Sequence, residues 1–236
     1  MVTKQVTLDQ AWSGGNIDCL SCSIRSSALL SGLTEQDFEQ MHEPVEQLDM
    51  QPGEVLYKVG DPGRHLFTLR SGLIKLVQYL PDGTPRIVRL MRSSDTIGLE
   101  ILVAEQYEHE AVVLRATGLC RYPKEAVSRF NQTNPVFHKD LMLRWQKALS
   151  DADTWLTQLS TGPAKKRMAN LLLRLKEENS TDCFLFSRED IGSILSITIE
   201  TASRTISEFK RTGLMKEIRH NHYALDVEGL TRLIES

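Results

Sequence analysis

The stretch SREDIGSILSITIETASRTISEFKRTG, from Ser187 to Gly213, is typical of two short helices joined by a tight turn. Ser187 and Thr198 are good N-cap residues, and each stands directly before a run with helical apolar spacing. Gly213 is a residue type that commonly follows the end of a helix. We expect the two helices to bury, in order, Ile191, Ile194 and Leu195, and then Ile199, Ala202, Ile206 and Phe209.

The opposite face of the second helix is polar. Glu200, Ser203 and Arg204 are three and four residues apart, so they project together. Arg can donate two hydrogen bonds to guanine, Glu can accept from cytosine, and Ser adapts to either base. This pattern predicts a helix-turn-helix whose second helix reads the major groove of DNA, and its plain alternative is a helical hairpin with a solvated face. The expected DNA-binding residues are Thr198, Glu200, Ser203, Arg204, Ser207 and Lys210.

A β-hairpin is expected after the second helix. Residues 214–218 and 223–227 have the pattern of two short strands, and the four residues between them form a plausible turn. Such a hairpin makes the helix-turn-helix a winged one and brings basic side chains close to a phosphate backbone. The basic and imidazole residues concerned are Lys216, Arg219 and His220.

The E-T-A-S-R run at 200–204, together with the wing and the segment before it, resembles the CRP/FNR family of bacterial transcription regulators. The E-x-x-S-R pattern is similar to the fumarate-and-nitrate-reduction (FNR) branch, whereas the cyclic-AMP receptor branch has Arg where this chain has Ile199. The resemblance implies a homodimer on double-stranded DNA with an inverted repeat TTGAT-N4-ATCAA. It also implies RNA polymerase as a partner, through a turn that matches residues 80–84.

Residues 44 to about 130 have short apolar strands separated by Gly and Pro turn signals, a pattern that favours an antiparallel sandwich or jelly roll. The family resembled has a β-roll at this place. The expected fold is therefore α+β: an N-terminal antiparallel β-roll like a cyclic-nucleotide-binding domain, a long dimerisation helix and a C-terminal winged helix-turn-helix. The expected parts are a cysteine-bearing segment 1–28, a β-roll sensor domain 29–134, a dimerisation helix 135–161 and a DNA-binding domain 162–236.

Composition fits this organisation. The chain has 236 residues, of which 25% are charged and 41% hydrophobic, which is enough for two modest domains. It has no run of about 18 apolar residues and no apolar N-terminal stretch, so we expect no membrane contact and a cytoplasmic location. The net charge of −3 neither supports nor excludes DNA binding, because basic residues gather on the second helix and the wing.

The β-roll itself argues against a cyclic nucleotide. Nucleotide-binding members of the family have a Glu that matches Glu100, followed about ten residues later by Arg-Ser or Arg-Thr for the cyclic phosphate. Here that stretch, residues 106–112, carries two carboxylates and no Arg, and carboxylates repel a phosphate. The plain interpretation of Glu100 is a surface or hairpin carboxylate.

The cysteines suggest metal or redox chemistry, because C-x2-C in an intracellular protein is more typical of these than of a structural disulfide. The FNR branch holds a [4Fe-4S] cluster with three N-terminal cysteines and one in the β-roll. Cys19, Cys22 and Cys120 match three of these four positions. The fourth position has no cysteine, and an oxygen ligand from Asp18 or Ser26 would complete the set.

Three interpretations of these cysteines remain open. The first is a labile oxygen-sensing cluster, and the second is a thiol switch or zinc site that uses the same residues. In the third, the cysteines have lost their role and the protein senses something else, including NO or CO through a haem. The possible axial ligands of a haem are His65, His109 and His138, and Cys183 is expected to be a small buried residue.

A long amphipathic helix is expected between the two halves. Its apolar residues recur at heptad spacing, which predicts a coiled-coil seam between two copies, and packing on the β-roll is the alternative. The expected dimer interface consists of Trp145, Ala148, Leu149, Ala152, Trp155, Leu156 and Leu159. Asp151 and Asp153 flank the seam, and the resemblance implies that acidic repulsion along this helix opposes dimer formation.

Competing classes have less support. The chain has no P-loop, no G-x-G-x-x-G after a strand and no recognisable catalytic triad, so we predict that it is not an enzyme. A cyclic-nucleotide-binding regulatory subunit is the remaining alternative. The helix-turn-helix and the missing phosphate-binding Arg both argue against it.

Overall fold

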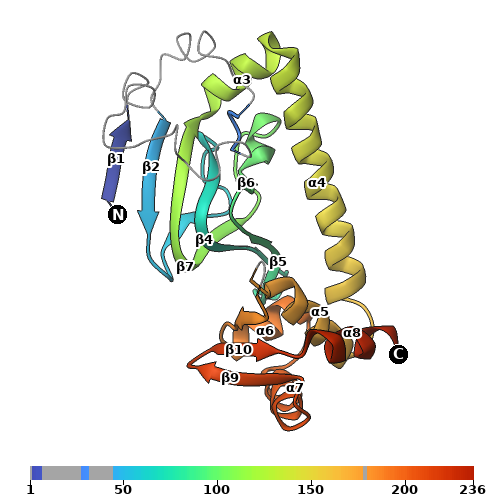
Figure 1. Ribbon diagram of the computed structural model, residues 1–236. Helices are drawn as coiled ribbons and strands as arrows, with labels where there is room; N and C mark the ends of the chain where they lie inside the picture. The colour runs from blue at the N-terminus through green and yellow to red at the C-terminus, as the bar shows by residue number, and fades with distance from the viewer. Residues whose placement is uncertain (1, 7–27, 32–44, 178–179) are drawn as a thin grey trace. The chain divides into compact units, whose positions relative to one another are not determined.

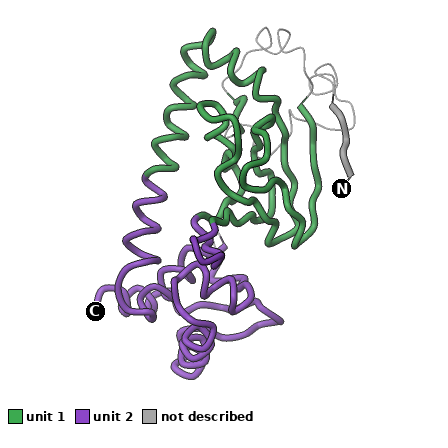
Figure 2. Tube along the Cα trace, turned by 180° about the vertical axis from the view of Figure 1, so that it is seen from behind, with its two compact units in different colours: residues 1–78, 89–149 green, residues 79–88, 150–236 purple. Residues whose placement is uncertain are grey.

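The computed structural model describes residues 2–6, 28–31, 45–177 and 180–236 (Figure 1). The chain forms two compact units, the first made of residues 1–78 and 89–149 and the second of residues 79–88 and 150–236 (Figure 2). Cys19 and Cys22 lie outside the described residues. The predicted α+β fold, with an N-terminal β-sheet domain and a C-terminal helix-turn-helix, is confirmed.

A β-roll forms the first unit. Its sheet has the strand order β1-β2-β7-β4-β5, with β3 also paired to β7 and β6 to β4. The strands are β1 (Val2–Val6), β2 (Val45–Met50), β3 (Val55–Tyr57), β4 (His65–Tyr79), β5 (Pro85–Met91), β6 (Thr96–Ile97) and β7 (Glu110–Pro123). Alternating apolar residues from β2, β4 and β7 fill the core, because successive side chains in a strand point to opposite faces.

A local irregularity bends the two longest strands. The pairing of β4 with β7 shifts register around Gly72, which has a φ of 94°. A Cβ at this position would lie 2.4 Å from the carbonyl oxygen of Ala116, so only glycine fits without a shift of the backbone. The two strands therefore curl here as the roll requires.

Helices follow the roll. The 3-10 helix η2 (Leu99–Leu102) connects β6 to β7, and α3 (Lys124–Thr133) follows β7. The long helix α4 (Pro135–Leu159) begins with Pro at its first position, and the Asn134 side-chain oxygen accepts hydrogen bonds from the amides of Val136 and Phe137, both at 3.0 Å. Asn134 therefore caps the helix, which begins at residue 135, the first residue of the predicted dimerisation helix.

The second unit is a winged helix-turn-helix. It contains α5 (Ala164–Leu175), β8 (Asp182–Phe184), α6 (Arg188–Leu195), α7 (Ile199–Arg211), β9 (Met215–Arg219), β10 (His222–Leu225) and α8 (Val227–Glu235). The three strands form an antiparallel sheet in the order β8-β10-β9, and α5 packs on α6, α7 and α8. The last predicted strand ends at Leu225 and not at residue 227, because the Asp226 side chain caps α8 by accepting from the Gly229 amide.

Candidate nucleic-acid interface

The turn between α6 and α7 is built by local sequence. The Ser187 hydroxyl accepts from the Asp190 amide at 3.0 Å, and the Thr198 hydroxyl accepts from the Thr201 amide at 3.2 Å, so both predicted N-caps are confirmed. A Cβ on Gly192 would lie 2.8 Å from the carbonyl oxygen of Ile197. Ser196 closes the turn in the left-handed region with a φ of 58°. These features hold the second helix at a fixed angle to the first.

Helix α7 has one buried face and one accessible face. Ala202, Ile206 and Phe209 are buried as predicted, and Thr205 is buried with them. The predicted DNA-reading side chains lie on the other face, where Glu200 and Arg204 are exposed and Ser203 is half-buried. Thr198, Ser207 and Lys210 are exposed as well. The geometry thus presents to a partner the polar cluster that the spacing predicted.

Ile199 corrects the sequence-based prediction. It was expected to be buried, but it is 50% exposed at the first position of α7. The helical stripe of this short helix begins one turn later, at Ala202, because the residue at the helix start lies beside the turn and not over the core. An exposed apolar side chain beside Glu200 is suited to contact a thymine methyl group in the major groove.

The charge on Glu200 is fixed by its place in the helix. Hydrogen bonds from its own backbone amide and from the Thr198 hydroxyl lower the pKa of the Glu200 carboxyl, and the nearby Arg204 charge lowers it further. The side chain therefore remains ionised at neutral pH. An ionised carboxylate is an acceptor only, which suits the amino group of a base and not a phosphate.

Lys210 connects the end of α7 to the wing. Its ammonium donates to Glu217 Oε2 at 2.5 Å and lies 4.9 Å from the centre of the Tyr223 ring. The hydrogen bond to Glu217 raises the pKa of Lys210 and lowers the pKa of Glu217. Lys210 was predicted as a DNA contact. In this structure it also orients β9 and β10 relative to the helix, a role that the sequence did not reveal.

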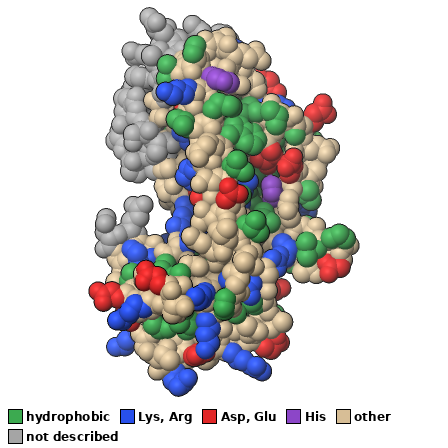
Figure 3. Space-filling model, turned by 90° about the vertical axis from the view of Figure 1, so that its right-hand side faces the viewer, with side chains coloured by type: hydrophobic (Ala, Val, Ile, Leu, Met, Phe, Trp, Pro, Cys, Tyr) green, Lys and Arg blue, Asp and Glu red, His purple; other side chains and the backbone are tan. Residues whose placement is uncertain are grey.

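The wing carries the other expected phosphate contacts. Lys216, Arg219 and His220 are exposed on β9 and in the turn that follows it. Figure 3 shows Lys and Arg side chains gathered on the helix-turn-helix unit. A positive surface around a polar recognition face is the electrostatic pattern of a protein that contacts the DNA backbone and reads base edges.

The β-roll holds the third expected metal ligand, Cys120, on β7. Its side chain is buried, and Thr68 on β4 is its cross-strand neighbour. No group of three His, Cys, Asp or Glu side chains within the described part of the chain is arranged to hold a metal ion. Cys183 on β8 is also buried, with the small apolar role that was predicted for it.

Glu100 does not lie on the surface as the plain interpretation expected. Its side chain in η2 is 17% exposed, and its Oε1 atom lies 4.0 Å from Nδ1 of His109. Both atoms are buried without a hydrogen-bond partner, as is the Tyr57 hydroxyl. Burial raises the pKa of Tyr57, and the charge of Glu100 raises it further.

The expected dimer seam on α4 divides into two parts. Trp155 is 8% and Leu159 1% exposed, so these two side chains pack within their own unit, where the Arg174 guanidinium also lies 5.8 Å from the Trp155 ring centre. Leu149 and Leu156 are 65% and 61% exposed. Figure 3 shows apolar side chains exposed along this side of the molecule. The remaining seam residues, Trp145, Ala148 and Ala152, are half-buried.

Met142 joins the exposed part of the seam. It is 44% exposed and stands seven residues before Leu149, which itself stands seven before Leu156. These three residues therefore form one accessible stripe at the spacing of a coiled coil. The heptad spacing alone would have included Met142, although the predicted seam begins at Trp145.

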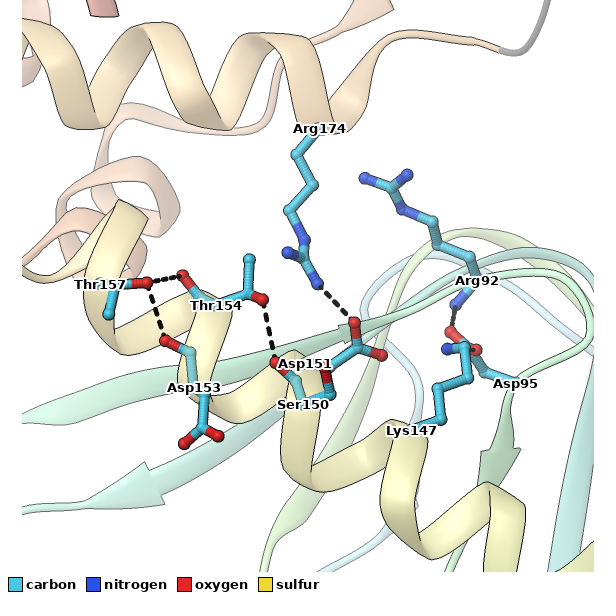
Figure 4. A network of polar contacts seen from close by, with 9 residues as sticks. All are labelled: Arg92, Asp95, Lys147, Ser150, Asp151, Asp153, Thr154, Thr157 and Arg174. Carbon is cyan, nitrogen blue, oxygen red and sulfur yellow. Dashed lines mark hydrogen bonds and ion pairs between the residues drawn. The ribbon is translucent and has the colours of Figure 1, made fainter.

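The two acidic residues beside the seam differ in their surroundings. Asp151 Oδ1 lies 3.5 Å from the guanidinium of Arg174 on α5, so its charge is partly offset (Figure 4). The Asp153 carboxylate is exposed and points away from this pair, while its carbonyl oxygen accepts from the Thr157 hydroxyl at 2.9 Å (Figure 4). Of the two, Asp153 is therefore the carboxylate better placed to repel a second copy.

Comparisons with known proteins agree with both halves of this description. Residues 47–134 match the cyclic nucleotide-binding domain, and residues 166–233 match the Crp-like helix-turn-helix domain. The described helices include none that is long and apolar enough to cross a membrane.

Relatives align over almost the whole chain. It is 27% identical to the transcriptional activator protein anr of Pseudomonas aeruginosa, over 88% of each chain. It is 25% identical to the fumarate and nitrate reduction regulatory protein of Escherichia coli, over 98% of this chain and 99% of that one. The solved structure of FixK2 from Bradyrhizobium japonicum has the same fold, with a TM-score of 0.74 at 21% identity over 80% of this chain and 96% of that one. The first two of these relatives are transcriptional regulators and not enzymes, and we conclude that the chain is a DNA-binding transcription regulator of the CRP/FNR family.

Proposed function

We propose that this regulator binds, as a homodimer, an inverted repeat of the form TTGAT-N4-ATCAA. The observation that carries the proposal is the accessible face of α7, where Glu200, Ser203 and Arg204 project together from a helix whose other face is buried. The Arg204 guanidinium donates to the guanine of each half-site, and the ionised Glu200 accepts from the paired strand. Ser203 adapts to the neighbouring base.

Two copies are needed because the two half-sites are related by a two-fold axis. The exposed stripe of Met142, Leu149 and Leu156 on α4 supports a parallel pairing of this helix with its copy. Exposed apolar residues in a line are unfavourable in water, and pairing removes them from it. RNA polymerase is the protein partner at promoters, through the turn 80–84, where Leu80 is 44% exposed.

The signal is oxygen or redox state, sensed by Cys19, Cys22 and Cys120. The donor chemistry fits an iron–sulfur cluster: three thiolates from the chain, with an oxygen ligand such as Asp18 or Ser26 at the fourth position. Cys120 is buried in the roll, where solvent access to such a group would be limited. When bound, the group would supply a reaction with oxygen that thiols alone provide more slowly. A thiol switch on the same residues is the alternative for this signal.

The DNA part of the proposal is tested by fluorescence anisotropy on a duplex with the inverted repeat and on duplexes with each base of TTGAT replaced. We expect salt-dependent binding in which replacement of a contacted base costs about 1–3 kcal/mol. Equal affinity for the repeat and for a scrambled duplex would refute it.

The sensing part is tested by iron and sulfide analysis and a visible spectrum of protein purified without oxygen. Colourless, iron-free protein with full DNA binding would refute the proposed cluster.

One observation favours a second signal, a small molecule in the β-roll. Glu100 Oε1, His109 Nδ1 and the Tyr57 hydroxyl are buried without hydrogen-bond partners, and such groups in a native protein call for a partner. A polar ligand, or a set of ordered waters, that donates to Glu100 and also pairs with His109 Nδ1 and the Tyr57 hydroxyl would satisfy them. Thermal shift with cyclic nucleotides and other small polar molecules tests this alternative, and a rise in melting temperature that is lost in Glu100→Gln would support it.

A further inference from the structure

Arg144 on α4 joins three separate parts of the first unit. Its Nε donates to Asp140 Oδ2 at 2.8 Å, one helical turn earlier on α4. Its Nη1 donates to the Thr96 hydroxyl on β6 at 3.0 Å, and its Nη2 donates to the carbonyl oxygen of Ala28 at 2.9 Å. The side chain is only 15% exposed. A planar guanidinium is suited to this position because it donates in several fixed directions at once, which an ammonium group cannot do.

The turn at 28–31 is held firmly on its other side. Leu29 is fully buried and its amide donates to the Thr68 hydroxyl at 3.3 Å, while Leu30 is 7% exposed. The Ala28 carbonyl also accepts from the Ser31 amide at 3.0 Å, so the same oxygen closes the turn and binds Arg144. A shift of this turn would therefore move an acceptor of the Arg144 side chain.

The same place is connected to Cys120 across the sheet. Thr68 on β4 pairs with Cys120 on β7 and with Thr96 on β6. Side chains of directly opposed residues lie on the same face of a sheet, so Cys120, Thr68 and Thr96 form a row, and all three are buried. The row ends at Arg144. The first residues described after the cysteine pair, Ala28 and Leu29, bind to the same row.

A second link between α4 and the sheet gives a comparison. Lys147, one turn after Arg144, donates to Asp95 Oδ1 at 2.9 Å, and the other carboxylate oxygen of Asp95 accepts from the Arg92 amide at 2.8 Å (Figure 4). Arg144 and Lys147 thus contact consecutive residues, Thr96 and Asp95. Arg144 also binds the turn at 28–31, through the carbonyl oxygen of Ala28.

We propose that Arg144 is the positioning residue through which Cys120 and the turn at 28–31 determine the position of α4. A change at Cys120 reaches Thr68 and Thr96 across the sheet, and a shift of the turn at 28–31 moves Ala28. Arg144 passes either change to the helix that carries the exposed apolar stripe. The proposal rests on the proposed redox-sensing function and adds its route to the dimer helix. By thermodynamic linkage, the state of the cysteines and the association of α4 should then change each other's free energy.

The test measures the dimer dissociation constant of the full-length protein by sedimentation. Each variant is measured twice, once prepared without oxygen and once after exposure to air. The variants are Arg144→Gln, Arg144→Lys and, as the matched control, Lys147→Ala. For wild type we expect the two constants to differ by a factor of about 5 to 150, the usual range of coupling between sites. The ratio should fall close to one in Arg144→Gln, be intermediate in Arg144→Lys and stay at the wild-type value in Lys147→Ala.

The ratios in wild type and in the variants separate the proposal from the sensing function on which it rests. A wild-type ratio preserved in Arg144→Gln would overturn the proposal and leave the sensing function intact. An equal loss of the ratio in Lys147→Ala would also overturn it, because a general loosening of α4 would then be enough. A ratio of one in wild type would refute the sensing function itself, and the proposal with it. Hydrogen exchange of the β-roll amides shows whether Arg144→Gln is folded, and Arg144→Lys gives the result if it is not.

Discussion

Replacing Leu156 with Ala should weaken the dimer while the monomer stays folded. Leu156 is 61% exposed in the single chain, so its removal leaves little cavity within the unit. Complete burial of a leucine side chain is worth about 1.5–3 kcal/mol, and the exposed part that Ala would lose corresponds to roughly 1 kcal/mol. A two-fold interface contains the residue twice, so the dimer should lose about 2 kcal/mol, a factor of about thirty in the dissociation constant.

Sedimentation equilibrium over a wide concentration range measures this constant. The matched control is Val136→Ala, which removes an apolar residue that is 66% exposed on the same helix. In the heptad that contains Met142 at its first position, Val136 falls at an outer position, so its replacement should leave the constant unchanged. Leu159 is 1% exposed, and Leu159→Ala should instead lower the free energy of unfolding by about 2–5 kcal/mol. An unchanged constant for Leu156→Ala, or an equal rise for Val136→Ala, would refute the assignment of the seam.

Three further predictions concern the recognition helix and the acidic residues. Arg204→Ala should cost about 1–3 kcal/mol in DNA binding and relax the preference at one base, and an unchanged TTGAT preference in anisotropy titrations would remove Arg204 from the readout. Lys210→Ala should weaken binding to all DNA sequences similarly and should lower the slope of log affinity against log salt concentration by about one. If Glu217→Ala weakens binding as much as Lys210→Ala does, and neither variant changes the salt slope, then Lys210 orients the wing and does not contact a phosphate. Asp153→Ala should favour the dimer about fivefold, the effect of removing a like-charge contact of about 1 kcal/mol. Asp151→Ala should favour it less, because Arg174 already offsets that charge, and an equal gain for both in ultracentrifugation would contradict this difference.

The helices and caps of the DNA-binding unit could be predicted from local sequence. Ser187 and Thr198 cap α6 and α7 as predicted, because an N-cap depends on side-chain to backbone hydrogen bonds within three residues. Gly213 follows α7 with a φ of 82°, again a local requirement. The polar face of α7 could be predicted in the same way, because residues three and four apart on a helix share a face regardless of what packs against the helix.

Which side chains are accessible and which charges are paired depends instead on long-range packing. Periodicity placed Ile199 in the core and Trp155 at the dimer seam, but burial depends on which elements pack against a helix, and Ile199 lies beyond the packed region while Trp155 is covered within its unit. The ion pair of Lys210 with Glu217 joins a helix to a strand. The contacts of Arg144 span residues 28 to 144. Such pairings depend on where distant segments of the chain meet, and no local pattern in the sequence encodes that.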